Sequence, residues 1–153
     1  MFWEEKIDAL KKNYSPDHFR VPFTEWSAVF AKIEAHFFNG GHPTYQFRNW
    51  GERLLGRPVI RSLDRTDLRE VINGLDPTTN YWAVIIFRDH PTAHQYLYDC
   101  RPDALLALLS MAPANFFIGD KKYRWLVYFR LDQKENTIAL INVDGSPTPF
   151  DFV

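Results

Sequence analysis

Apolar residues recur at helical spacing through the first half of the chain. In residues 2–13 the aromatic and aliphatic side chains share one helical face and the charged side chains share the other, which predicts an amphipathic helix. The same pattern returns after Thr24, the expected N-cap, and stops at Gly40 and Gly41, so a second helix is expected there. A third helix is expected at 65–73 because Gly74 directly follows the pattern.

Strand patterns dominate the second half. Residues 81–87 are apolar at every position and rich in β-branched and aromatic side chains, which predicts a central strand covered on both faces. Further strands are expected at 58–61, 95–100 and 137–143. Pro102 stands at the first position of a short helix that carries a stripe of leucines.

Residues 121–131 show the clearest alternation of apolar and polar positions. One face of this expected strand is aromatic and aliphatic, whereas the other carries Arg124, Tyr128 and Arg130. We therefore expect the first face to be buried and the second to be open to water. A hairpin should connect this strand to the one at 137–143.

Because helices come first and strands follow, the pattern predicts an α+β fold. N-terminal helices should pack on a mainly antiparallel sheet, with one short helix between the strands. A chain of 153 residues that is 46% hydrophobic supports one core, so a single domain over 1–153 is expected. The aromatic share of 16% is high enough to serve either that core or an interface.

The charge balance argues against nucleic acid as a partner. The chain has 18 basic and 19 acidic residues, so its net charge of -1 creates no general attraction for a polyanion. The first residues lack a signal-peptide pattern, and no run of about 18 apolar residues is present, so a cytoplasmic protein outside the membrane is expected. A single cysteine, Cys100, cannot form an internal disulfide.

Few residues form a pattern that indicates catalysis. His90 and His94 have the spacing of two metal ligands on a helix, but Pro91 between them favours a solvated polar turn instead. His94 and Cys100 are one candidate base and nucleophile, and the alternative for Cys100 is a small buried side chain. No metal or cofactor is therefore expected.

Arginines recur every four residues from Arg57 to Arg69, with Arg61 and Arg65 between them. On one helical face they would form a basic stripe that binds phosphates or an acidic protein. Interleaved acidic residues give the alternative, a solvated surface whose charges pair with one another.

One segment resembles a known family. Residues 116–126 read FFIGDKKYRWL directly after the leucine-rich helix, and this run is similar to a strand motif of small uncharacterised bacterial proteins, a domain of unknown function. The likeness extends over about 81–143. Family members often continue into an Asn-His-His-Asp turn, which the chain lacks. The resemblance implies a bacterial origin, and by analogy in size an immunity-like protein that neutralises a toxin.

The absent catalytic set and the surplus of aromatic residues together favour a non-enzymatic, protein-binding domain. Its expected contact residues are those of the 121–131 strand or of the aromatic segment near 45–50, namely Arg124, Tyr128, Arg130, Tyr45 and Trp50. The alternative is a small enzyme or a domain that binds an anionic small molecule through Arg61, Arg65, His90 and His94. The sequence predicts no particular oligomeric state.

Overall fold

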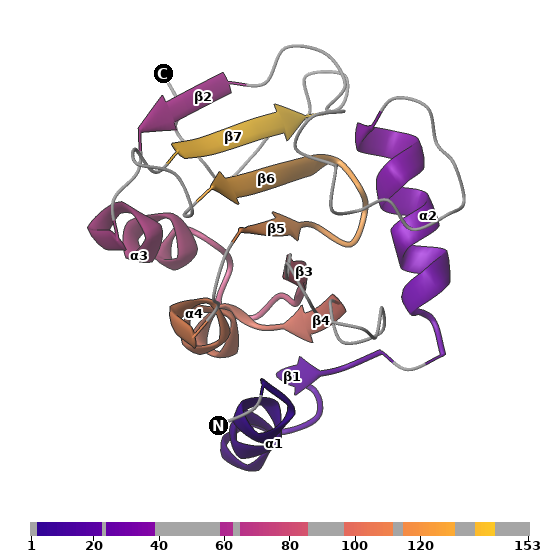
Figure 1. Ribbon diagram of the computed structural model, residues 1–153, viewed down its shortest axis with the longest axis vertical. Coiled ribbons are helices and arrows are strands. Elements are labelled where there is room, and N and C mark those ends of the chain that lie inside the picture. Colours follow the sequence, from indigo (N-terminus) through magenta and orange to yellow (C-terminus); the bar gives the residue numbers. More distant parts are fainter. Residues whose placement is uncertain are drawn as a thin grey trace.

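The computed structural model describes residues 3–22, 24–38, 59–62, 65–85, 97–111, 115–130 and 137–142 (Figure 1). Four helices lie within these segments. Their bounds are α1 (Trp3–Asn13), α2 (Trp26–Phe37), α3 (Arg65–Asn73) and α4 (Pro102–Met111). Seven strands accompany them. Their bounds are β1 (Phe19–Arg20), β2 (Val59–Ser62), β3 (Tyr81–Ile85), β4 (Leu97–Cys100), β5 (Phe116–Gly119), β6 (Trp125–Arg130) and β7 (Thr137–Asn142).

The strands form one sheet in the order β1-β4-β3-β5-β6-β7-β2. Every pair of neighbouring strands in this sheet is antiparallel. Helix α4 separates β4 from β5 along the chain, as the sequence predicts. The predicted α+β fold is therefore confirmed, including the hairpin that pairs β6 with β7.

Helices cover both faces of the sheet. Helix α2 lies on one face, where Phe38 at its end meets Phe117 edge-on at 5.7 Å between ring centroids. Helices α1, α3 and α4 lie on the other face (Figure 1), where Trp3 of α1 contacts Tyr98 at 6.4 Å between centroids. The indole nitrogen of Trp3 also donates a hydrogen bond of 2.6 Å to the Tyr98 hydroxyl. The sheet is thus the middle of three layers.

This layering corrects the prediction of a water-exposed face on the sixth strand. Leu126 is 1% exposed and Tyr128 is 7% exposed, because the α2 layer covers the side of β6 that was expected to be open. The ring of Phe117 stacks on Tyr128 at 4.3 Å between centroids, and Phe38 packs on Phe117 from outside. The alternation of apolar and polar positions did not predict burial here, because aromatic residues pack on both faces of the strand.

The start of this strand also differs from the prediction. Residues 120–124 form a turn between β5 and β6, so the strand begins at Trp125 and not at 121. Tyr123 has a positive φ of 56°, a left-handed conformation that breaks the extended pattern. Asp120 binds the backbone amide of Arg124 at 2.7 Å, which closes the turn. A side-chain hydrogen bond therefore overrides the alternation of the sequence.

The bounds of the remaining elements agree closely with those predicted from the sequence. Helix α3 is where it was predicted, whereas α2 begins at Trp26 with Glu25 as its N-cap and not Thr24. Strand β3 is buried at all five positions, which confirms a strand covered on both faces. The glycine pair at 40 and 41 and the turn expected at 88–94 lie outside the described residues.

Cys100 provides a test of this burial. Its side chain is fully buried, and burial raises the pKa of the thiol well above its usual value, with the Asp99 charge as a further cause. We expect a thiol reagent such as 5,5′-dithiobis(2-nitrobenzoate) to react with the native protein at least about a thousandfold more slowly than with the protein in guanidinium chloride, because labelling requires opening of the structure. Native and denatured labelling rates within about tenfold of each other would contradict the buried position.

Candidate functional site

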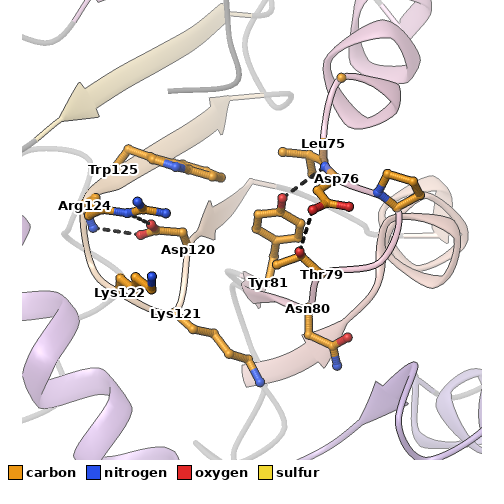
Figure 2. A pocket seen from close by; sticks show the side chains of 12 residues that line it. Leu75, Asp76, Thr79, Asn80, Tyr81, Asp120, Lys121, Lys122, Arg124 and Trp125 are labelled. Atoms are coloured by element: carbon orange, nitrogen blue, oxygen red, sulfur yellow. Dashed lines mark hydrogen bonds and ion pairs between the residues drawn. The ribbon is translucent and has the colours of Figure 1, made fainter. Parts of the chain in front are cut away.

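A cleft of about 800 Å³ lies at one end of the sheet, between two connecting segments (Figure 2). Residues 74–77 and 79–81, between α3 and the start of β3, form one wall. Residues 120–122, 124 and 125, in the β5–β6 turn and the start of β6, form the other wall. The cleft is open, since most of its polar lining residues are exposed.

The β5–β6 turn is fixed by its own side chains. Asp120 is buried and accepts two hydrogen bonds from Arg124, 2.7 Å from the backbone amide and 2.6 Å from Nε. The left-handed conformation of Tyr123 costs about 1–2 kcal/mol. Helix α2 compensates with two contacts, since His36 stacks on the Tyr123 ring at 5.3 Å between centroids and Lys32 Nζ lies 5.7 Å above it.

The opposite wall is a compact polar loop. The Asp76 carboxylate accepts hydrogen bonds from the Thr78 amide at 2.9 Å, the Thr78 hydroxyl at 2.8 Å and the Thr79 hydroxyl at 3.0 Å. The bond from the Thr78 amide, followed by the two hydroxyl bonds, lowers the pKa of Asp76, so this carboxylate stays charged. The Asp76 amide donates to the Tyr81 hydroxyl at 3.1 Å. The backbone of the loop is thereby hydrogen-bonded to the Tyr81 side chain.

Two aromatic rings form the floor of the cleft. Tyr81 and Trp125 meet at 5.8 Å between ring centroids. Burial raises the pKa of the Tyr81 phenol, and the charges of Asp76 and Asp120 act in the same direction. The Asp76 amide and the Arg124 cation oppose this rise. The phenol is therefore neutral at ordinary pH and keeps its hydrogen as a donor.

Lys121 connects the turn to the sheet. Its Nζ lies 2.7 Å from Oδ2 of Asp99, whose side chain is only 5% exposed, and 4.4 Å above the Trp82 ring. Asp99 also binds Arg20 Nη2 at 2.9 Å and Asn80 Nδ2 at 2.9 Å. Figure 2 shows Lys121 pointing away from Arg124. Lys121 therefore has a structural partner outside the cleft.

The indole of Trp82 adds an unusual feature beneath the turn. Its Nε1 is buried and makes no well-aligned hydrogen bond. Burial raises the pKa of the neighbouring Tyr123 phenol, and its contact with the Trp82 indole opposes this rise.

Two cations remain available to a ligand. Lys122 is exposed, and its Nζ forms no ion pair with any described residue. The side chain of Arg124 is 49% exposed, and within the described segments its only side-chain partner is Asp120, which binds Nε. No described residue binds either terminal nitrogen of the guanidinium, and Figure 2 shows these nitrogens directed toward the opposite wall.

The structure separates the contact residues that the 121–131 pattern placed together. Arg124 lines the cleft, whereas Arg130 lies at the other end of β6, about 20 Å further along an extended chain. Tyr128 between them is buried, and its hydroxyl accepts a hydrogen bond from Asn115 Nδ2 at 3.2 Å. The structure therefore does not bring these three residues together in one surface patch.

Two of the other predicted site residues are placed by the backbone alone. Arg61 is in strand β2 at the edge of the sheet, and Arg65 begins α3. Outside the described residues lie Tyr45, Trp50, His90 and His94.

Several cleft residues were missed by sequence reasoning. Tyr81 was assigned only to a strand pattern and Trp125 only to the core, whereas Lys122 was placed on the same strand face as Arg124. A signal for the turn was present, since Asp120 stands four residues before Arg124 between two apolar runs. A short acidic side chain at such a point is typical of a turn.

The described part of the chain shows neither a metal-binding cluster nor a membrane-spanning helix. No three histidine, cysteine, aspartate or glutamate residues there lie close enough together to hold a metal ion. No helix among the described residues has the length and apolar character needed to cross a membrane.

Comparisons with protein-family models, with curated proteins and with solved structures found no match.

The two neighbouring lysines give a matched test of the site. We expect Lys121→Met to lower the free energy of unfolding by about 1–2 kcal/mol, because the buried Asp99 loses one of its charged partners while Arg20 and Asn80 remain. Lys122→Met should change it by less than about 0.5 kcal/mol. Urea denaturation of both variants measures the difference, and equal effects would contradict the assigned roles.

Proposed function

We propose that this protein is a protein-binding domain and that the cleft between residues 74–81 and the β5–β6 turn is its docking site. The observation that supports this most is an open depression in which Arg124, whose side chain is 49% exposed, lies above the buried rings of Tyr81 and Trp125. Arginine, tyrosine and tryptophan are the residue types that contribute most binding energy in protein interfaces. Exposed polar residues surround the two rings, as in the rim of an interface.

Charge gives the cleft a preference that the whole chain lacks. Of the three cations that line it, Lys121 pairs with Asp99 outside the cleft and Arg124 pairs with Asp120 through Nε. Lys122 forms no ion pair with a described residue. Lys122 beside the terminal nitrogens of Arg124 favours an acidic segment of a partner and increases its association rate.

An analogy specifies the class of the proposed partner protein. The similarity of residues 116–126 to small bacterial proteins extends the proposal to an immunity-like role, in which the bound protein is a toxin. That segment contains the β5–β6 turn, which forms one wall of the cleft.

Binding of a small anion is the second candidate. Two features favour it: Lys122 forms no ion pair with a described residue, and the terminal nitrogens of Arg124 have no hydrogen-bond partner among the described residues. These two residues take the place of the arginines and histidines that the sequence suggested for such a ligand. The width and exposure of the cleft favour a partner chain, because sites for small molecules bury most of their ligand.

Affinity capture from cell extract tests the proposal when it is run with two charge-reversed variants. Lys122→Glu with Arg124→Glu changes the cleft, and Lys12→Glu with Arg69→Glu makes the same charge change at exposed positions of α1 and α3. We expect the wild type and the control to retain a stoichiometric partner, and the cleft variant to retain at least about tenfold less, about 1.4 kcal/mol in binding free energy.

Circular dichroism establishes that both variants are folded before capture. Equal capture by all three proteins would place binding elsewhere and contradict the proposal. Capture by none, together with a thermal shift from a small anion that the cleft variant loses, would favour the second candidate.

A further inference from the structure

We propose that the cleft recognises a carboxylate of the partner protein, an aspartate or glutamate side chain within an extended segment, through the terminal nitrogens of Arg124. This inference rests on the proposed function and names the chemistry that the docking site selects.

Arg124 is oriented before any ligand arrives. Asp120 binds both its backbone amide and its Nε, at 2.7 and 2.6 Å, so the turn and the guanidinium share one buried acceptor. The two terminal nitrogens can then present parallel N–H groups to the two oxygens of a carboxylate. A guanidinium held in this way loses less side-chain entropy on binding than a free one. Asp120 is thus a positioning residue.

A second donor faces the same space. Tyr81 is only 5% exposed, and its hydroxyl accepts a hydrogen bond from the Asp76 amide at 3.1 Å. The hydrogen of this hydroxyl has no acceptor among the described residues, although the side chain lines the cleft. A carboxylate has about four lone-pair positions, enough to accept from both Arg124 and Tyr81. The buried phenol therefore points to an acceptor supplied from outside.

The charges of the walls favour a singly charged group over a phosphate. Asp76 and Asp120 both line the cleft, and the hydrogen bonds of Asp76 lower its pKa so that it remains ionised. A phosphate group carries a charge of about -1.5 to -2 at pH 7 and would be repelled more strongly by these two anions. A carboxylate carries one charge, and Lys122 is the one lining cation that forms no ion pair with a described residue.

The dimensions of the cleft indicate a chain and not an isolated ion. Its volume of about 800 Å³ is far larger than one carboxylate needs and is comparable to pockets that hold drug-sized molecules. An extended segment that carries the carboxylate can occupy this space.

Blocked peptides provide the probe, because acetylated and amidated ends leave only side-chain charges. One pool carries a central glutamate flanked by apolar residues, and the matched pool carries glutamine at the same position. Binding is followed by NMR at the Arg124 Nε–H and the Trp125 indole N–H. We expect the glutamate pool to shift both signals at about millimolar concentration, and the glutamine pool to bind at least about tenfold more weakly.

Variants then assign the effect to Arg124. Arg124→Lys should weaken the glutamate pool at least about tenfold, because lysine cannot form the two parallel hydrogen bonds. Arg130→Lys, at the exposed far end of β6, should leave binding unchanged. The comparison of the two peptide pools on the wild type needs no variant, so a folding defect in Arg124→Lys would not remove the test.

Each other outcome has a defined meaning. Equal binding of the glutamate and glutamine pools would overturn carboxylate recognition while leaving the cleft as a site for a protein segment. Shifts with inorganic phosphate or free glutamate but with neither pool would overturn both the inference and the proposed function. An absence of any shift would overturn the carboxylate site, and the capture experiment would then decide the proposed function independently.

Discussion

The buried carboxylate of Asp99 is the interaction on which the arrangement of this end of the sheet depends. It lies on β4 and receives donors from Arg20 on β1, Asn80 before β3 and Lys121 in the β5–β6 turn. A charge with 5% exposure is costly unless it is paired, so these donors must stay in place for the fold to be stable. One side chain thereby fixes three segments that are distant in the sequence.

The distribution of aromatic residues determines where binding can occur. Helix α2 covers one face of the sheet, and α1, α3 and α4 cover the other, so the rings of Phe117, Tyr128 and Phe129 are all used in the core. In the described part of the chain, the polar side chains that line the cleft therefore lie in connections at the strand ends. Loops at such positions carry function because a rigid scaffold holds them. The cleft beside Arg124 is a site of this kind.

Periodicity predicted the elements better than their surroundings. The fold class, the helices at 3–13 and 65–73 and the buried strand at 81–85 follow from local patterns, which report burial within one element. The burial of Tyr128 could not be predicted from a local pattern, because α2, which covers it, lies about 90 residues earlier in the chain. For the site, Arg124 was identified from sequence, but Tyr81 and Trp125 required knowledge of which connections meet in space.

A double-mutant cycle between Asp99 and Lys121 tests most directly whether this ion pair connects the turn to the sheet. The free energies of unfolding of Asp99→Asn, Lys121→Met and the double variant give the coupling energy between the two side chains. The structure predicts a favourable coupling of about 1 kcal/mol or more, since the two groups lie 2.7 Å apart and Asp99 is buried. Effects that add to within about 0.3 kcal/mol would contradict a direct role for this pair.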